Sequence, residues 1–181
     1  GSTTNQLGGN PDHAPQILRF GPASGGGTAL TAEPRGVTVL VSASDDGQWV
    51  AFPSFADLTG DNHDRSQEVF LLATDGSQTR QLTDESAPNG GSVTQVALSG
   101  DGQRVAFVAN TDPLGQNPDN LPQLFVVDSD ATGLRQLTAA ARGSFGQISM
   151  SEHGPRVATA PSAVATDLFE CPLSLGYERQ R

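Results

Sequence analysis

The segment from residue 57 to residue 64 holds the densest group of side chains that could bind a metal ion. It reads Asp-Leu-Thr-Gly-Asp-Asn-His-Asp, and its candidate ligands are Asp57, Asp61, Asn62 and Asp64. Carboxylate and amide oxygens suit Ca²⁺, which takes about six to eight oxygen ligands. The spacing differs from that of an EF-hand, and Asp and Asn also form turns by bonding to their own backbone. A calcium site and a self-bonded loop are therefore both open interpretations of this segment.

A second polar segment, residues 108–123, has the same length as residues 53–68, sixteen residues each. It is interrupted by prolines, which reduce the entropy that a loop loses when it is ordered. Rigid scaffolds commonly bind through such loops, so we expect both segments to emerge on one face and to form a contact surface. The candidate binding residues are Asp57, Asp61, Asn62, Asp64, Asp112, Asn117 and Asp119.

The other reactive side chains show no catalytic pattern. His13, His63 and His153 lie in three separate loops, whereas a zinc site needs at least three converging ligands. The sequence has no Gly-x-Ser-x-Gly nucleophile turn and no glycine-rich phosphate loop between a strand and a helix. Cys171 falls in an expected strand, where a packed thiol is the simpler interpretation. We therefore expect no catalytic residues, no enzymatic activity and no cofactor, with calcium as the one exception left open.

The composition and net charge of the chain indicate which partners and which kind of fold to expect. The chain has 181 residues and a net charge of −10, and all ten of its basic residues are arginine. An acidic surface repels phosphate backbones, so nucleic acid is not an expected partner. No apolar run approaches the roughly 20 residues of a membrane span. With 21 Gly, 12 Pro and only 35% hydrophobic residues, the composition indicates short strands and many turns.

One sequence pattern recurs along the chain and predicts a repeat architecture. Residues 44–52 return as residues 99–107 and, more weakly, as residues 151–159, at steps of 55 and 52 residues. Asp46 and Asp101 recur at the turn of this pattern, so we expect them to bond the N–H groups of their own turns.

The same role is expected of Asp75 and Asp128 at a later turn. Trp49 occurs in one copy only and is expected to fill a gap between repeats. Arg80 and Arg135 are expected to lie over a sheet edge or to pair with the turn acids.

Short runs between turn residues predict four antiparallel strands in each repeat. The expected strands are 17–20, 27–31, 37–41, 49–52, 69–72, 80–83, 93–98, 104–107, 124–127, 135–138, 147–150, 156–159 and 168–171. The chain then divides into a flexible lead-in at 1–16, a half unit at 17–36, full units at 37–86 and 92–139, and a degenerate unit at 145–181.

The motif Ser-x-Asp-Gly-x-x-Val-Ala-Phe, followed by Val-Phe-Leu-Leu, Asp-Gly and Arg-Gln-Leu-Thr, resembles the TolB-type WD-like β-propeller repeat over residues 17–181. The resemblance implies an all-β fold of four-stranded antiparallel blades, about three and a half of them in this chain. Closed rings typically have about four to eight blades. The chain could be a fragment, a partner or second copy could complete the ring, or further strands could lie in the weakly patterned regions.

The resemblance also implies a function. We expect a non-enzymatic protein-interaction scaffold located in the periplasm or secreted, with a protein partner or self-association completing the ring. Two alternatives stay open. One is a non-catalytic propeller segment of a larger secreted enzyme, such as a peptidase. The other is a calcium- or carbohydrate-binding module that uses the two long loops.

Overall fold

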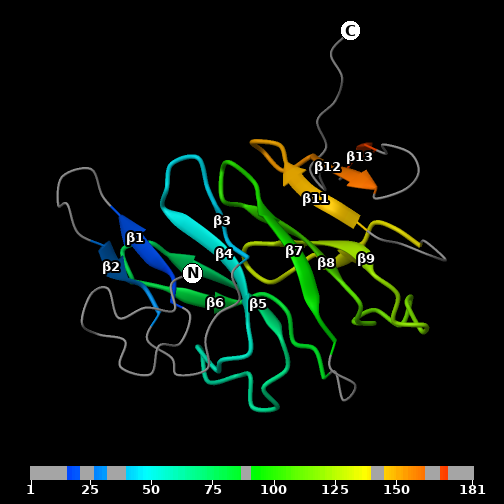
Figure 1. The fold of residues 1–181 in the computed structure, drawn as a ribbon, viewed down its shortest axis with the longest axis horizontal. Coiled ribbons are helices and arrows are strands. Elements are labelled where there is room, and N and C mark those ends of the chain that lie inside the picture. The colour runs from blue at the N-terminus through cyan, green and yellow to red at the C-terminus, as the bar shows by residue number, and fades with distance from the viewer. Residues whose placement is uncertain are drawn as a thin grey trace, which may run out of the picture.

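Every regular element of the protein is a β-strand in the part of the chain that the structure describes (Figure 1). The structure is a computed structural model and describes residues 16–20, 27–31, 40–86, 91–139, 145–161 and 168–170. Across these ranges no helix is long and apolar enough to cross a membrane.

Four antiparallel sheets follow one another along the chain, and within each sheet neighbouring strands are consecutive in sequence. The first sheet contains β1 (Leu18–Phe20) and β2 (Gly27–Ala29). The second contains β3 (Ser42–Ala43), β4 (Trp49–Ser54), β5 (Glu68–Ala73) and β6 (Thr79–Gln81). The third contains β7 (Val93–Leu98), β8 (Arg104–Ala109), β9 (Gln123–Asp128) and β10 (Arg135–Gln136). The fourth contains β11 (Phe145–Met150), β12 (Arg156–Pro161) and β13 (Leu168–Glu170). The predicted all-β blade architecture is confirmed.

The two complete sheets have the same internal register. Phe52 of β4 pairs with Phe70 of β5, and Phe107 of β8 pairs with Phe125 of β9, 55 residues further along. Both pairs stack, with ring centroids 6.0 and 5.4 Å apart. Equal register places equivalent side chains at the same depth, so the sequence repeat is a structural repeat.

Each complete sheet buries both faces because a neighbouring sheet covers each one. On one side of the third sheet, Val105 and Phe107 join a cluster with Val69 and Leu71 of the second sheet. On its other side, Ala106, Val108 and Leu124 pack against Ile148 and Val157 of the fourth sheet. A further cluster joins Ile17 to Phe52 and Phe70. No sheet could bury its apolar faces alone, which is the physical reason for stacking blades side by side.

The hairpin turns at the start of each repeat are built by their aspartates, as the recurrence predicts. Asp46 Oδ1 accepts hydrogen bonds from the Ser44 hydroxyl (2.6 Å) and the Gln48 N–H (2.9 Å). Asp101 Oδ1 accepts the equivalent bonds from Ser99 (2.7 Å) and Gln103 (3.0 Å). Both partners of each bond lie within the same turn, as the sequence pattern predicts.

The later turn corrects one prediction. Asp75 Oδ1 accepts from the Ser77 N–H (2.9 Å) as expected, but the equivalent acceptor one repeat later is Asp130, which bonds the Thr132 N–H (3.0 Å). Asp128 is still the last residue of β9, where it lies opposite Arg104 and accepts from its Nε at 2.7 Å. A repeat step of 55 residues places Asp130, not Asp128, at the position of Asp75.

The first strand of the second sheet also differs from the prediction. The apolar run 37–41 was expected to be the strand, whereas β3 is Ser42–Ala43 and Val41 is exposed outside it. Pairing with β4 is limited to the two residues next to the turn, Ser42 with Ala51 and Ala43 with Val50. Residues 32–39 lie outside the described part of the chain.

Three other expectations fall partly on residues outside the described ranges. They are the lead-in up to residue 15, the end of the expected strand 168–171 with Cys171, and His13. Gln16, the last residue of the expected lead-in, is described and is buried.

Neighbouring blades are connected at their turns, which lie side by side at one end of the molecule (Figure 1). The Asp45 N–H donates to the Gly100 carbonyl (2.9 Å), and the Asp101 N–H donates to the Glu152 carbonyl (2.7 Å). Trp49 packs against the core shared by the second and third sheets. Arg80 covers the Trp49 ring at 5.3 Å and donates to the Ser129 carbonyl of the next blade (2.8 Å), so it bridges neighbouring blades.

Candidate functional site

Two long loops emerge from the end of the blades opposite these turns (Figure 1). One joins β4 to β5 through residues 55–67, and the other joins β8 to β9 through residues 110–122. They have equal length and leave equivalent strands, so the blades hold them in equivalent positions. We call them the first and second long loops.

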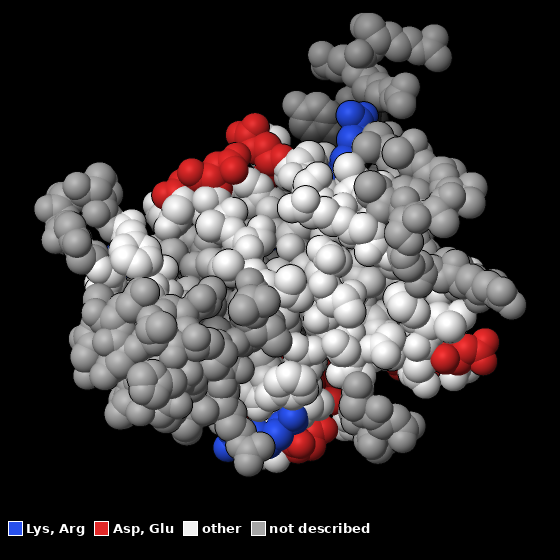
Figure 2. Space-filling model, viewed as in Figure 1, with Lys and Arg blue, Asp and Glu red and all other residues white. Residues whose placement is uncertain are grey.

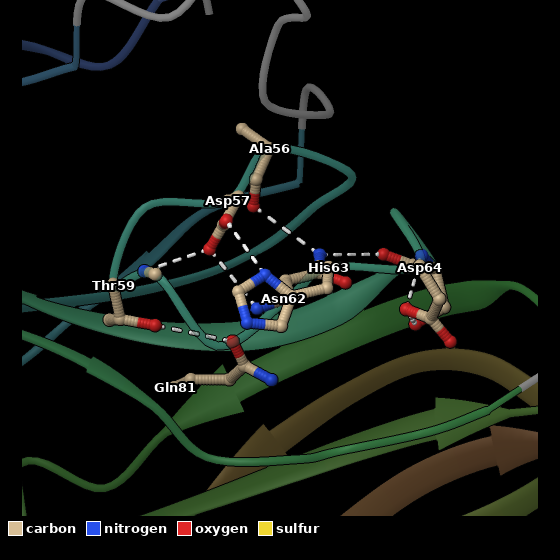
Figure 3. Close-up of polar contacts among 9 residues, drawn as sticks. Ala56, Asp57, Thr59, Asn62, His63, Asp64 and Gln81 are labelled. Carbon is tan, nitrogen blue, oxygen red and sulfur yellow. Dashed lines mark hydrogen bonds and ion pairs between the residues drawn. The ribbon is translucent and has the colours of Figure 1, made fainter.

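A buried asparagine ties each long loop together (Figure 3 shows the first). Asn62 Nδ2 donates to the carbonyls of Ala56 (3.3 Å) and Ser66 (2.9 Å). Asn117 Nδ2 donates to the carbonyls of Thr111 and Leu121, both at 2.8 Å. Only 1% of Asn62 and 4% of Asn117 is exposed. Their amides therefore supply the hydrogen bonds that water would otherwise donate to these loop carbonyls, which would be buried without a partner if the amides were absent.

An aspartate closes the first half of each long loop. Asp57 Oδ1 accepts from the N–H groups of Gly60 (2.8 Å) and Asn62 (3.0 Å). Asp112 Oδ1 accepts from the Asn117 N–H at 2.6 Å. The other Asp57 oxygen lies 3.7 Å from Nδ1 of the exposed His63 (Figure 3). Sequence reasoning had treated these acids as binding candidates, and the structure gives them a part in shaping the loops.

The remaining candidates face solvent. Asp61, Asp64 and Asp119 are exposed. Asp64 Oδ1 accepts from the N–H (3.1 Å) and hydroxyl (2.9 Å) of Ser66, and these hydrogen bonds lower the pKa of Asp64. Of the seven predicted binding residues, four are thus buried or half-buried within the loops and three are exposed.

The first long loop shows the hydrogen bonding of a self-bonded loop. Oxygens of Asp57 and Asp64 are occupied by N–H and O–H donors of the loop itself. Across the described ranges, no three His, Cys, Asp or Glu side chains are grouped so that they could hold a metal ion. Calcium binding at Asp57, Asp61, Asn62 and Asp64 stays a prediction.

Sequence reasoning missed a groove between the second and third sheets. It has a volume of about 400 Å³ and runs beside residues 81–85, which continue from β6 toward the third sheet. Asp61 of the first long loop, Pro113 of the second and Leu134 before β10 also line it. These residues are far apart in sequence, and no motif marks them. The one available signal was the acidic pair Asp84 and Glu85 directly after a predicted strand.

Two carboxyl groups lie close together beside this groove. Glu68 is fully buried, and its carboxylate accepts from the Thr83 hydroxyl, the Ser66 hydroxyl (2.5 Å) and the Glu85 N–H (2.9 Å). Glu85 itself lines the groove. Burial, and next the negative charge of Glu68, raise the pKa of Glu85 to about 7. A carboxyl group that titrates near neutrality is often found at a binding site.

Charge is distributed unevenly over the surface (Figure 2). In this view acidic side chains gather over part of the turn end, with a basic group further along the same end, and acidic and basic side chains lie together at the loop end. Much of the face between them is uncharged.

Neither a protein-family model nor a curated protein sequence matches the chain. Solved β-propellers do match its fold. TolB from Acinetobacter baumannii is 19% identical with a TM-score of 0.54, over 84% of this chain and 34% of that one. The putative TolB from Agrobacterium tumefaciens is 19% identical with a TM-score of 0.55, over 81% of this chain and 45% of that one.

Proteins of other kinds share the fold as well. A chain of a nidogen/laminin complex is 15% identical with a TM-score of 0.55, over 81% of this chain and 49% of that one. An oligogalacturonate lyase in complex with manganese is 18% identical with a TM-score of 0.54, over 81% of this chain and 36% of that one. The chain spans between a third and a half of these structures. At such identities the similarity shows a TolB-like propeller fold, which agrees with the three and a half blades expected from the sequence.

Proposed function

We propose that this run of propeller blades is a protein-interaction scaffold of TolB-like type, that it acts outside the cytoplasm, and that it has no catalytic role. The two TolB neighbours and the neighbour from the nidogen/laminin complex support a protein-binding use of the fold. The TolB-type repeat motif supports the periplasm or the cell exterior as its location.

The observation that carries this proposal is the pair of preformed long loops with exposed apolar side chains. Phe55 in the first long loop is 42% exposed, and Leu114 in the second is 36% exposed. The same loops are held by buried Asn62 and Asn117. A surface that is already ordered loses little entropy on binding, and apolar anchors supply much of the binding energy of protein interfaces. The two loops therefore have the properties of a contact surface for a protein.

A second candidate function is a propeller segment of a larger enzyme. It is favoured by the oligogalacturonate lyase among the structural neighbours. The gene around this sequence tests it, because a catalytic domain in the same reading frame would support this second function.

Site-specific photo-crosslinking in the source cells tests the scaffold proposal. A photoreactive phenylalanine replaces Phe55 or Leu114, and the matched control carries it at Ser77, which is exposed in the β5–β6 turn at the opposite end. The proposal predicts one defined protein adduct from both loop positions and none from Ser77. Absence of an adduct at the loops, or the same adducts from all three positions, would contradict it.

A further inference from the structure

The sheets at the two ends of the blade series each expose a face that is covered in the sheets between them. The first sheet (β1–β2) and the fourth sheet (β11–β13) lie on opposite sides of the molecule (Figure 1). The second and third sheets have a packed neighbour on both sides, whereas in the described part of the chain each end sheet packs against one sheet only. The repeat shows which residues of the end sheets occupy positions that are buried between blades elsewhere.

Equivalent hydrogen bonds align the first sheet with the second. The Ile17 N–H donates to Thr31 Oγ1, and the Val69 N–H donates to Thr83 Oγ1, both at 3.0 Å. β1 and β2 therefore correspond to β5 and β6, the last two strands of a complete sheet. Each residue of β1 corresponds to the residue 52 positions later in β5.

The exposed face of the first sheet is apolar. Phe20 is 68% exposed, whereas Leu72 and Val127, at the same position in the second and third sheets, are 3% and 0% exposed. Leu18 lies on the same face of β1 and is half-buried. The Phe20 ring lies against Gly27 of β2, where a Cβ would come within 2.7 Å of it. The first sheet thus holds in place an aromatic ring that in other blades would be covered by the preceding blade.

The exposed face of the fourth sheet carries small side chains. Val157 packs against the third sheet, so Ala158, the next residue of β12, points away from it. Ala158 is exposed, whereas Ala51 and Ala106, at the same position in the second and third sheets, are fully buried by the next blade. Ser149 of β11 pairs with Ala158 and is exposed on the same face.

The two exposed faces match the two sides of an interface that the molecule already contains. Between the second and third sheets, Ala51 of one sheet shares a cluster with Phe125 and Val127 of the other. These two residues of β9 correspond to Leu18 and Phe20 of β1. A face with small side chains therefore packs against a face with large ones, and the end sheets present one face of each kind.

We propose that two copies of this chain dock head to tail, with the first sheet of each copy covering the fourth sheet of the other. A single copy cannot bring its two exposed faces together, because they lie on its opposite sides. Two copies with about three and a half blades each supply about seven, and closed rings typically have about four to eight. Two identical junctions close such a ring with two-fold symmetry. The interface is separate from the long loops, so the inference goes beyond the proposed scaffold function and does not rest on it.

The first test is the mass of the intact chain in solution, measured by native mass spectrometry and light scattering over a range of concentrations. We expect a dimer, with a melting temperature that rises with protein concentration. A monomer at all concentrations, or assemblies of more than two copies, would overturn the proposal. The same measurement on the polypeptide as the source cells produce it is the second arm. A monomer there would show that other blades of one polypeptide cover these faces, and it would also overturn the proposal.

The second test is a pair of charge-matched variants. Ala158→Glu places a charge opposite an apolar face and should weaken dimerisation by at least about tenfold. Ala139→Glu adds the same charge at an exposed alanine after β10 and should not weaken it. An unchanged circular dichroism spectrum shows that each variant is folded. Equal dimerisation by both variants and the unmodified chain would rule out the fourth sheet as part of the interface.

The third test identifies the partner of the first sheet directly. A photoreactive phenylalanine replaces Phe20 in an unlabelled copy, which is mixed with an unmodified ¹⁵N-labelled copy before irradiation. We expect an adduct between the unlabelled residue 20 and a labelled peptide from residues 145–161. Adducts that form only within one copy, or that join residue 20 to the long loops of the labelled copy, would contradict head-to-tail docking.

Discussion

Asn62 and Asn117 occupy the same position in successive loops, but they satisfy their amides differently. Asn117 Oδ1 accepts from the Leu121 N–H at 3.2 Å. In the first long loop the equivalent N–H, that of Ser66, donates to Asp64, and Asn62 Oδ1 is buried without a hydrogen bond. Asn117 therefore makes the more complete set of contacts.

The difference predicts unequal effects of removing the two amides. Asn117→Ala leaves two loop carbonyls and one N–H without their partner and should lower the free energy of unfolding by about 2–3 kcal/mol. Asn62→Ala should lower it by less, because that amide contributes only its donors. Urea unfolding measures both, with Asp119→Ala as an exposed control in the same loop. An effect of Asn117→Ala no larger than that of the control would contradict this role.

The raised pKa of Glu85 predicts how stability changes with pH. Its pKa is about 7 in the folded chain and 4.5 in an ordinary exposed site, so between these values the folded state binds more protons than the unfolded state. Stability therefore falls as pH rises through this window. The Glu85→Gln variant lacks the titrating group. From about pH 5 to about pH 8, its free energy of unfolding should therefore rise progressively relative to that of the unmodified chain. Urea unfolding measures both free energies across this range. A difference between them that stays constant with pH would contradict the raised pKa of Glu85.

At the residue scale, sequence reasoning succeeded where a residue's role is local. Asp46 and Asp101 recur beside glycine, and bonding to the adjacent turn follows from that neighbourhood. The contact of Glu68 with Glu85 joins residues seventeen positions apart across a sheet edge, so only the folded chain reveals it.

At the scale of elements, the turn glycines decide how closely neighbouring blades approach. Gly102 and Gly76 both have positive φ, +71° and +80°. A Cβ on Gly76 would meet nothing within 4 Å, but on Gly102 it would lie 2.9 Å from Trp49 Cδ1. The absence of a side chain at Gly102 therefore permits the left-handed conformation of its own turn and leaves room for Trp49 of the preceding blade.

These two glycines form a matched pair of substitutions. Gly76→Ala should lower the free energy of unfolding by about 1–2 kcal/mol, the cost of a left-handed conformation for an L-residue. Gly102→Ala should lower it further, because Trp49 must also move. Trp49 is the only tryptophan, so its fluorescence should change with Gly102→Ala and not with Gly76→Ala. Equal losses and unchanged emission in both variants would show that the blades do not meet here.

Most strands of the two complete sheets could be predicted because the repeated motif is clear in the sequence. Equal spacing of the two Val-Ala-Phe motifs predicts the shared register of β4–β5 and β8–β9. The edge strand β3 was misplaced because apolar residues alone do not show which of them pair with a neighbour. Asp128 was assigned to a turn because it precedes the true turn residue, Asp130, by only two positions.

At the scale of the whole molecule, stacked blades provide the rigidity on which the loop surface depends. The clusters on the two sides of the third sheet bury both of its faces, so both long loops leave strands that are covered by neighbours. The exposed Phe55 and Leu114 are presented by this framework. Propeller architecture was predictable from the sequence, but the groove was not, because it lies between two blades and takes its residues from both long loops.

Amide hydrogen exchange of the intact chain tests most directly whether the long loops are preformed. The N–H groups of Gly60, Asn62, Asn117 and Leu121 donate to loop side chains, so they should exchange at least on the order of a hundredfold more slowly than in an unstructured peptide. Exchange of these four amides at the unstructured rate, while β5 and β8 stay protected, would mean that the loops are not held in place and would contradict a ready-made binding surface.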